Sequence, residues 1–400
     1  MQVDTGRTER ELSIGIALSG GGVRAAAFHL GVLGFLAQMG LLGGVRFISS
    51  VSGGSLAIGL VMAATRNAWP TDEQYLHVVL PVAIRRLQHD GLAFRLLLEG
   101  LKRPWDLFNN RANLLASALQ QSWKIAGNIA DLPPTPQWFI NTTAYESGKS
   151  WRIMQERMGG YQLEYCWNPR IPLASALAAS AAYPGLVGPL VFRTKDHEWR
   201  RFTGWENRAT EDCKPTYRTL HLWDGGVYDN LGLEALFKPS GESLRKGCNF
   251  LLVSDASYPL SSERPTFLHR RALRLLEISM DQVRSLRSRM AVAYFSSNPN
   301  SGVYLRTGNT AGAICGACKC EDDRILAAAA TCMPTDAVDC VAHYPTNLST
   351  LSREDCHTLV RHGWETAAFT LFTRCPELFS IDAYRAYESS LFEIAPAPGR

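Results

Sequence analysis

The amino-acid sequence predicts an α/β protein whose central sheet is largely parallel and flanked by helices. A short apolar run at residues 13–18 leads into three consecutive glycines at residues 20–22. Residues 23–38 follow with alanine, leucine and phenylalanine at helical spacing, and Gly40 supplies a cap that ends this helix. This order predicts a strand, a glycine loop and a helix.

A second strand and helix follow directly. Residues 45–51 (VRFISSV) are expected to form a second strand, Gly53 and Gly54 provide a tight turn, and residues 55–65 form an apolar helix. Two such units in succession are typical of a parallel sheet, because parallel strands need a crossover connection. Residues 249–254 are almost entirely apolar, as expected for a strand buried on both faces of that sheet.

The later elements continue this alternation. Further strands are expected at residues 138–143, 151–154 and 220–223. Helical patterns occupy residues 72–128 (interrupted at Pro104 and Trp105), 171–180 and 269–294. The last of these is amphipathic and rich in arginine, and we assign its arginines to a solvent-exposed helix face.

The expected organisation is one main domain at residues 13–373, between a polar N-terminal tail at residues 1–12 and a C-terminal tail at residues 374–400. Two insertions are expected within it. The first is a helical, cap-like segment at residues 71–130. The second is a cysteine-rich segment at residues 308–340, which is rich in glycine, alanine and threonine and which we expect to be mobile.

Composition and charge exclude some classes of function. The 400 residues carry 41 basic and 37 acidic side chains, and a net charge of +4 is too small to indicate nucleic acid as a partner. Residues 1–12 lack the apolar core of a signal peptide. The apolar windows at residues 55–64 and 174–191 are, respectively, too short for a membrane span and broken by proline and glycine. We expect a cytoplasmic protein with peripheral membrane contact at most.

Ser52 is the candidate nucleophile. It stands in Ser50-Val51-Ser52-Gly53-Gly54, where a predicted strand turns into a predicted helix. Such a turn exposes the serine hydroxyl, and its small flanking residues let strand and helix pass closely. The dipole of the following helix favours an alkoxide or oxyanion at its N-terminus. The alternative for this motif alone is a glycine-rich turn without chemistry.

Two further motifs accompany the serine turn. The successive glycines Gly20, Gly21 and Gly22 let backbone N–H groups converge on an oxyanion. A phosphate loop is the alternative, but the spacing of the dinucleotide and P-loop motifs is missing. Asp224 precedes two glycines at a predicted strand end, where its carboxylate can accept the proton of a serine hydroxyl. Taken alone, Asp224 fits an Asx-turn more readily.

In this order, the motifs resemble the patatin-like phospholipase family, which is related to the cytosolic phospholipases A. The family pattern is a glycine loop followed by an arginine (here Arg24), a serine elbow (here Ser52) and an Asp-Gly-Gly motif (here from Asp224). A further family block, Ala-Ser-x-Ala-x-Pro, matches residues 179–184. The resemblance covers most of residues 13–236 and implies a three-layer fold with a helical cap insertion.

The resemblance also implies an activity, that of a lipid acyl hydrolase acting on phospholipids or other acyl esters without a cofactor or metal. Ser52 would attack the ester carbonyl while Asp224 takes its proton, and water would then hydrolyse the acyl-serine. The oxyanion would be held by backbone amides of Gly20, Gly21, Gly22 and Gly53.

Three positions qualify this resemblance. Arg24 is expected to bind the substrate headgroup or to support the glycine loop, with a surface arginine as the alternative. Ser50 stands where the elbow pattern has its first glycine, and Ser19 stands where many family members have aspartate.

Two other functions stay open at this point. A Ser-His-Asp esterase of the α/β-hydrolase type would combine Ser52 with Asp255 and with His357 or His362. It leaves Asp224 unexplained and places the nucleophile after only two strands. A non-catalytic lipid-binding protein is the other alternative, and labelling of Ser52 by a serine-directed phosphonate would distinguish it from an enzyme.

Two segments carry weaker signals. Five of the ten cysteines cluster, and the first pair has zinc-ligand spacing while the rest fit no common zinc pattern, so we expect thiols or disulfides at Cys315, Cys318, Cys320, Cys332 and Cys340. Residues 84–124 are amphipathic and basic. Phe94, Trp105 and Phe108 would anchor this stretch at a membrane surface, and a helical cap packed on the core is the alternative.

Overall fold

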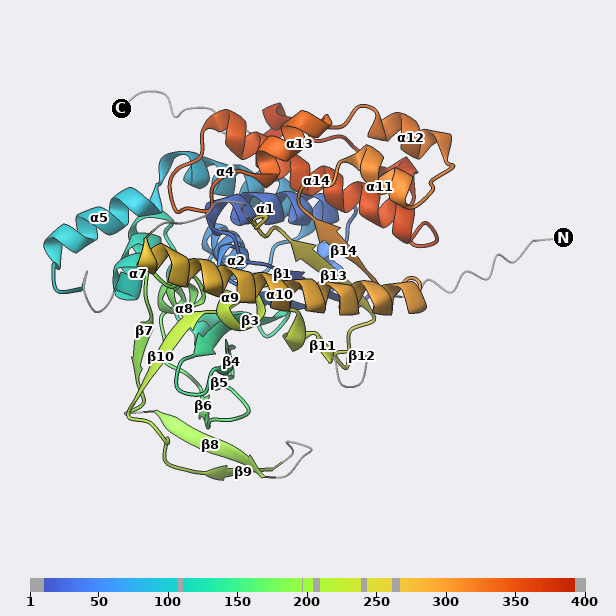
Figure 1. Ribbon diagram of the computed structural model, residues 1–400. Coiled ribbons are helices and arrows are strands. Elements are labelled where there is room, and N and C mark those ends of the chain that lie inside the picture. Colours follow the sequence, from blue (N-terminus) through green and yellow to red (C-terminus); the bar gives the residue numbers. More distant parts are fainter. Residues whose placement is uncertain are drawn as a thin grey trace.

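The computed structural model describes residues 11–106, 111–195, 197–203, 209–238, 243–260 and 267–392. Over these residues a sheet of 12 strands runs through the centre of the molecule, with helices on both faces (Figure 1). The predicted α/β fold with mostly parallel central strands is confirmed. Within the same ranges no helix combines the length and apolarity needed to cross a membrane.

Five parallel strands form the centre of the sheet. They pair in the order β14 (Gly302–Arg306), β13 (Phe250–Asp255), β1 (Ile14–Leu18), β2 (Val45–Ser50) and β3 (Gln137–Ala144). Every residue of β1 and β13 is buried, as their apolar sequences require. Because parallel strands end at one edge of a sheet, the loops that follow β1, β2 and β13 meet there.

Alternate side chains of the central strands face two hydrophobic cores. The helices that cover them are α1 (Gly22–Gln38), α2 (Gly53–Ala64), α10 (Leu268–Ser297) and α14 (Arg353–Arg374). Ile16 and Leu252 belong to the core that includes α1, α2 and α14. Ala17 and Val253 belong to the core that includes Ala291 of α10. The molecule therefore has the three layers of helix, sheet and helix that the family resemblance implied.

The helices α1 and α14 cross at two glycines. An added Cβ at Gly31 would overlap the carbonyl oxygen of Val360, and one at Gly363 would overlap that of Phe28. The two backbones therefore touch, which only glycine permits. This contact holds α1, whose first residue belongs to the glycine loop.

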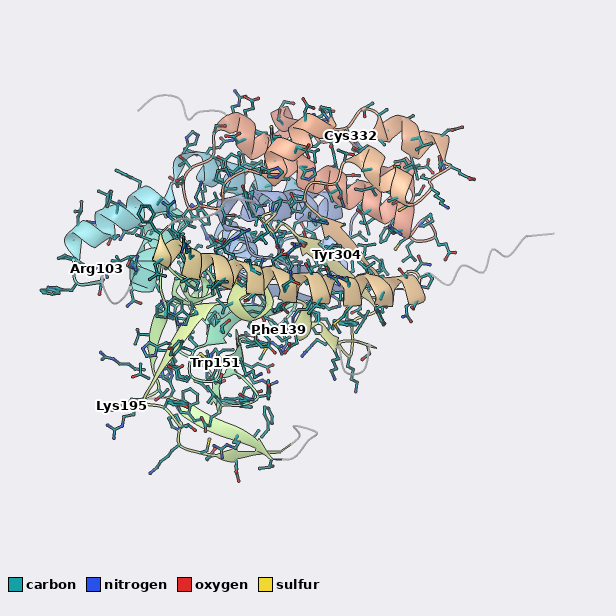
Figure 2. The ribbon with its side chains drawn as sticks, viewed as in Figure 1. Arg103, Phe139, Trp151, Lys195, Tyr304 and Cys332 are labelled. Atoms are coloured by element: carbon teal, nitrogen blue, oxygen red, sulfur yellow. The ribbon has the colours of Figure 1, made fainter. Side chains whose placement is uncertain are left out.

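The remaining part of the sheet is antiparallel, and only its strands near residues 151–154 and 220–223 were expected from the sequence. It continues from β3 through β4 (Lys149–Ile153), β5 (Arg157–Gly159), β6 (Tyr165–Trp167), β8 (Glu198–Thr203) and β9 (Ala209–Asp212). A branch pairs β10 (Thr219–Asp224) with both β3 and β7 (Leu190–Arg193). This extension protrudes below the helices (Figure 1) and packs around the fully buried Trp151, labelled in Figure 2.

The segment expected to be helical between residues 72 and 128 is helical. It contains α3 (Asp72–Gln74), the π-helical turn η2 (Tyr75–Val79), α4 (Leu80–His89), α5 (Leu92–Lys102) and α7 (Arg111–Ser122). The helix α5 ends just before Pro104, and α7 packs against α5 and α8 (Leu173–Ser180). Phe108, one of the expected anchors, lies outside the described residues.

The cysteine-rich segment differs from the expectation of a mobile insertion. It forms α11 (Ala311–Ala317), α12 (Asp323–Ala329) and α13 (Thr335–Ala342), which pack on α14. Buried apolar residues, among them Ile314 and Val338, supply the driving force for this packing. All ten cysteines are free thiols. Among the described residues, no group of three or more histidine, cysteine or acidic side chains is placed to hold a metal ion.

Candidate active site

A pocket of about 570 Å³ lies at the edge where the parallel strands end. Its lining includes the glycine loop at residues 20–22, Ser52 and Asp224. The rest of the lining comes from one face of α10 and from loops that contain Tyr183, Tyr258 and Asn347. Three sequence motifs that are far apart in the chain thus meet at one cavity. The cap-like segment contributes no lining residue in the described part of the chain.

Ser52 occupies a strained turn between β2 and α2. Its backbone has φ 48° and ψ −116°, a conformation that an L-amino acid rarely adopts, and α2 begins at the next residue. An added Cβ at Gly53 would overlap the Gly22 carbonyl oxygen, and one at Gly54 would lie 2.6 Å from the Leu18 carbonyl oxygen. Small residues at these positions therefore let strand and helix approach, as the elbow motif predicted.

A chain of buried hydroxyls supports the serine turn from below. Trp138 Nε1 donates to Ser50 Oγ at 2.7 Å, and the Ser50–Ser55 and Ser55–Ser180 hydroxyl pairs are both 2.8 Å apart. Ser180 donates to the Asn141 carbonyl oxygen at 2.8 Å. Because each hydroxyl has one proton to donate, Ser55 donates to Ser180 and Ser50 donates to Ser55. The departure from glycine at Ser50 is thereby explained, because its hydroxyl fills a place in this chain.

The family block at residues 179–184 connects the serine turn to Asp224. Ser180 Oγ accepts the amide N–H of Ser52 at 3.1 Å, and the Ala182 carbonyl oxygen accepts that of Asp224 at 3.2 Å. The Ser180 carbonyl oxygen also accepts the Gly225 N–H at 3.4 Å. One short segment therefore fixes both turns relative to each other.

Asp224 is the last residue of β10, and its side chain is buried. Oδ1 accepts the Gly226 N–H at 2.7 Å, whereas Oδ2 makes no hydrogen bond of normal geometry to any described residue. Burial raises the pKa of Asp224 to about 7, although the Gly226 amide and the nearby Ser52 hydroxyl act to lower it. A buried carboxylate with one unpartnered oxygen, lining a pocket beside a serine, can accept a proton near neutral pH.

The glycine loop places two helix N-termini at the pocket. Gly21 has φ 142° and Gly22 has φ 63°, values that glycine adopts without strain. The helices α1 and α2 begin at Gly22 and Gly53, so their first amide groups face the same cavity edge. Gly20 differs from the expectation, because its amide already donates to the Asn230 carbonyl oxygen at 3.1 Å.

Ser19 anchors the base of this loop. Its hydroxyl accepts the Ala256 N–H at 2.8 Å, and its carbonyl oxygen contacts His29 Nε2 at 3.0 Å. Burial lowers the pKa of His29 to about 4, so the imidazole is neutral. A neutral serine accommodates these close neighbours at the position where many family members have aspartate.

Arg24 is buried beneath the loops that surround the pocket. Its guanidinium donates to the Ala256 carbonyl oxygen at 2.6 Å and to Thr346 Oγ1 at 3.4 Å, and it lies 5.7 Å from the ring centre of Tyr258. Burial lowers its pKa to about 10, which keeps it charged at neutral pH. Of the two roles expected for Arg24, these contacts favour support of the loops, and the alternative of a surface arginine is wrong.

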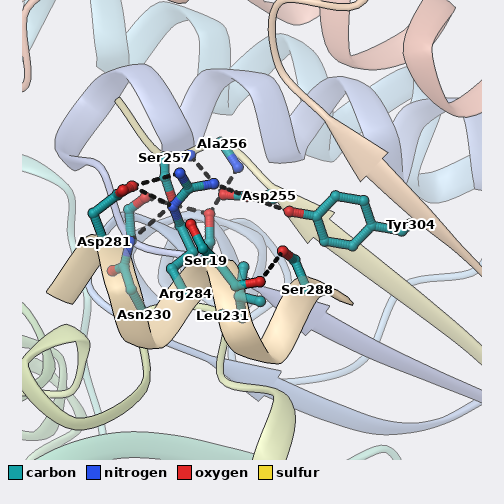
Figure 3. Close-up of polar contacts among 12 residues, drawn as sticks. Ser19, Asn230, Leu231, Asp255, Ala256, Ser257, Asp281, Arg284, Ser288 and Tyr304 are labelled. Carbon is teal, nitrogen blue, oxygen red and sulfur yellow. Dashed lines mark hydrogen bonds and ion pairs between the residues drawn. The ribbon is translucent and has the colours of Figure 1, made fainter. Parts of the chain in front are cut away.

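Asn230 is a pocket residue that the sequence motifs missed. It follows α9 (Gly226–Asp229), lines the pocket, and donates from Nδ2 to Ser257 Oγ at 2.9 Å (Figure 3). Its carbonyl oxygen also holds Gly20. The only available signal was its position shortly after Asp224, since the contact with Gly20 joins distant parts of the chain.

Arg284 brings the long helix α10 to the pocket. It pairs with Asp255 at 2.8 Å and with Asp281 at 2.5 Å, and Tyr304 donates to the same Asp255 carboxylate at 2.5 Å (Figure 3). Burial raises the pKa of Asp255, but the Arg284 charge and these hydrogen bonds outweigh it and hold the pKa below its usual value. The expectation that the arginines of this helix face solvent is therefore wrong for Arg284.

The residues of the Ser-His-Asp alternative do not assemble with Ser52. His362 Nε2 accepts the Gly308 N–H at 3.0 Å, and burial lowers its pKa to about 4. His357 Nδ1 contacts the Tyr387 hydroxyl at 2.7 Å. Neither histidine is among the described residues that line the pocket. The geometry therefore favours Asp224 over a histidine as the partner of Ser52.

The fold and the pocket together define a class of protein. A parallel sheet, a serine on a strained strand-to-helix turn and a buried carboxylate at the same cavity form an arrangement found in serine hydrolases. A family model described as patatin-like phospholipase matches residues 16–237, more than half of the chain. The chain belongs to the patatin-like phospholipase family, as its motifs had implied.

Curated relatives agree with this assignment. Patatin-like phospholipase domain-containing proteins of Aspergillus terreus and Neosartorya fischeri are each 26% identical to the chain over 247 residues. The matched region is 59% of this chain and 28% of each relative. The chain thus spans little more than a quarter of the length of these relatives.

The solved structures that match the chain are distant from it in sequence. Human GIVD cytosolic phospholipase A2 in complex with methyl gamma-linolenyl fluorophosphonate is 14% identical, with a TM-score of 0.45, and the match covers 89% of this chain and 57% of that one. VipD from Legionella pneumophila is 13% identical, with a TM-score of 0.41 and coverage of 91% and 67%.

Proposed function

We propose that the chain is a lipid acyl hydrolase of the phospholipase type, with Ser52 as nucleophile and Asp224 as base. The observation that carries this proposal is the meeting of two unusual groups at one cavity. Ser52 has a strained backbone, and Asp224 is buried with an unpartnered oxygen. Membership of the patatin-like phospholipase family supports the same assignment.

In the proposed reaction, Ser52 Oγ bonds to the ester carbonyl carbon while its proton passes to Asp224. The leaving alcohol takes that proton, and an acyl-serine remains. Water then gives a proton to Asp224 as its oxygen attacks the acyl carbon. Ser52 regains the proton when the fatty acid leaves, so the enzyme returns to its starting state.

The negative charge that develops on the carbonyl oxygen needs hydrogen-bond donors. We assign this role to the amides of Gly21, Gly22 and Gly53, which lie at or beside the first residues of α1 and α2. Both helices direct the positive end of their dipoles toward this point. Gly20 would contribute by close packing instead, because an added Cβ would lie 3.1 Å from Ser52 Cβ.

The pocket lining fits an acyl chain. Leu186, Leu260, Met280 and Leu348 give it an apolar part, and Ser52 lies in the same cavity. We therefore propose phospholipids or other acyl-ester lipids as substrates. Because such lipids occur in aggregates, the proposal includes peripheral contact with a membrane.

The test is hydrolysis of a soluble nitrophenyl ester and of phospholipid vesicles by the wild type, Ser52→Ala and Asp224→Asn. We expect both variants to lose at least about a hundredfold in kcat/KM, since positioned proton transfer alone contributes that much. Matched controls are Ser279→Ala and Asp339→Asn, two exposed side chains outside the pocket lining. Both controls should retain wild-type rates.

Each contrary result has a definite meaning. Full activity of Asp224→Asn would disprove the Ser-Asp pair. An inert wild type whose Ser52 is also not labelled by a fluorophosphonate would favour a non-catalytic lipid-binding protein. A pH profile of kcat/KM offers an independent check, because a base with a pKa of about 7 makes the rate rise through neutral pH.

A further inference from the structure

The helix α5 exposes several large apolar side chains, although Leu92 is buried in the core and Leu96 packs against it. Its carboxylate Glu99 is only 3% exposed, whereas Phe94 is 68%, Leu97 55% and Leu101 70% exposed. Trp105, just beyond its end, is 83% exposed. Helices of globular proteins normally turn their apolar stripe toward the core. This helix carries, in addition to the buried Leu92, a second apolar face that is turned outward.

The exposed residues form one continuous stripe. Phe94, Leu97 and Leu101 are separated by three and four residues, which places them on the same side of a helix. We call these three residues and Trp105 the α5 stripe. Large side chains gathered on one exposed face mark a surface that meets a partner, whereas scattered ones need no explanation.

The α5 stripe leads toward the mouth of the pocket. The helix α7 packs on α5, and its first residue, Arg111, donates to the Leu186 carbonyl oxygen at 3.3 Å. Leu186 lines the pocket and is 53% exposed. The neighbouring Gly185 faces Leu273 of α10. In Figure 1, α5, α7 and the first turns of α10 lie on the same side of the molecule.

Charges beside the stripe complement an anionic surface. Lys102 and Arg103 pair with the buried Glu99 at 2.9 and 3.1 Å, and Arg103 also lies 3.9 Å from Asp106. Their side chains are about half exposed, which lets the charged ends lie beside the apolar stripe. Arg95 adds another positive charge on the same helix. An apolar face bordered by lysine and arginine is typical of helices that lie in a membrane interface.

We propose that the α5 stripe, together with Leu186, is the surface by which this protein docks on a lipid membrane, with the pocket mouth turned to the bilayer. The inference rests in part on the proposed function, since a hydrolase of lipids must draw its substrate from an aggregate. Docking in this orientation lets an acyl chain pass from the bilayer to Ser52 along apolar side chains.

The test measures binding to vesicles of equal parts phosphatidylcholine and phosphatidylglycerol by co-sedimentation. All proteins carry Ser52→Ala, so that the lipid is not consumed. We compare this parent with Leu101→Glu/Trp105→Glu and with the matched control Leu326→Glu. Leu326 is an exposed leucine of α12, on the opposite side of the molecule (Figure 1). Thermal unfolding of each protein verifies that it is folded.

We expect the double variant to bind at least about tenfold more weakly, because two large side chains no longer enter the interface. The control should bind as the parent does. If the double variant is unfolded, Phe94→Gln supplies the same comparison with a milder change. Equal binding by parent and stripe variants would overturn the proposal.

Two other results would also overturn it. The first is a parent that does not bind vesicles. The second is a concentration-dependent dimer, detected by sedimentation, that the stripe variants dissociate, which would identify a second copy as the occupant. The hydrolysis of a soluble ester is independent of these outcomes, so failure of the docking surface is distinguishable from failure of the proposed function.

Discussion

The serine turn and the outer face of α5 place their side chains in opposite environments. Around Ser52, polar groups are buried: the side chains of Ser50, Ser55 and Ser180 are inaccessible to solvent and bonded to one another. On the outer face of α5, apolar groups are exposed, and Leu101 is 70% accessible to solvent. Both regions reverse the usual rule that polar side chains face solvent and apolar side chains are buried.

The difference shows what each region must contact. Burying a hydroxyl costs free energy unless it has hydrogen-bond partners inside the protein. The partners that these hydroxyls need hold the serine turn in one conformation. An exposed apolar stripe adds little to folding, because its side chains leave water only when a partner arrives. The serine turn is therefore organised by contacts within the fold, whereas the proposed role of α5 depends on a contact outside it. Four changes test this contrast.

The largest effect on stability is expected from Asp224→Asn, and it depends on pH. The pKa of Asp224 is 3.8 in the unfolded chain and about 7 in the folded one, so between these values only the folded state holds the proton. Wild-type stability therefore falls as pH rises through this window. Each pH unit is worth about 1.4 kcal/mol, so the variant should gain up to about 4 kcal/mol by pH 8.

Chemical denaturation at several pH values measures this gain. The difference between variant and wild type should be small at pH 4 and reach its full size above pH 7. A difference that stays constant across this range would show that Asp224 does not titrate with a raised pKa. Asp339→Asn, an exposed aspartate, serves as the control and should show no such trend.

The next effect concerns the crossing of α1 and α14. Gly31→Ala places a methyl group on the Val360 carbonyl oxygen. The obstructing atoms belong to the backbone of α14, which cannot move aside as a flexible side chain could. We expect a loss of about 3 kcal/mol in the free energy of unfolding. Gly316→Ala is the matched control, because nothing lies within 4 Å of its added Cβ. Equal stability of the two variants would contradict the close helix crossing.

The sequence predicted four of the five parallel strands and the positions of the candidate site residues at strand ends, because both leave local signals. An apolar strand that ends in glycines marks a turn at the sheet edge, so Ser52 and Asp224 could be located. Asn230 left only its position shortly after Asp224 and Ser55 left no signal, since both act through contacts between distant segments. The short strands of the antiparallel extension, such as β6, carry too few residues to show a period.

A smaller effect is expected from Ser55→Ala at the centre of the hydroxyl chain. Ser50 would lose its acceptor, because its own oxygen already accepts from Trp138. A buried donor without a partner costs about 2 kcal/mol. Ser55→Ala should also slow ester hydrolysis, since Ser180 supports the Ser52 amide. Unchanged stability and rate would show that the chain has no part in holding the turn; exposed Ser279→Ala is the control.

The composition of the cysteine-rich segment misled the prediction for a physical reason. Glycine, alanine and threonine suggest a loop when no apolar face is visible. Here the buried residues Ile314 and Val338 lie on separate short helices, so each helix alone has too little apolar surface to reveal itself. Only packing on α14 completes the core, and that contact is invisible in the sequence.

The smallest effect should come from Leu101→Ala on the α5 stripe. Leu101 is 70% exposed, so its truncation should change the free energy of unfolding by less than about 0.5 kcal/mol. Leu115→Ala, a fully buried leucine on the neighbouring α7, should cost about 3 kcal/mol in the same denaturation experiment. If both variants lost the same free energy of unfolding, Leu101 would have to pack within the fold. That result would contradict an external partner for α5. If Leu101→Ala leaves the stability unchanged but weakens vesicle binding, the leucine is needed for docking and not for folding.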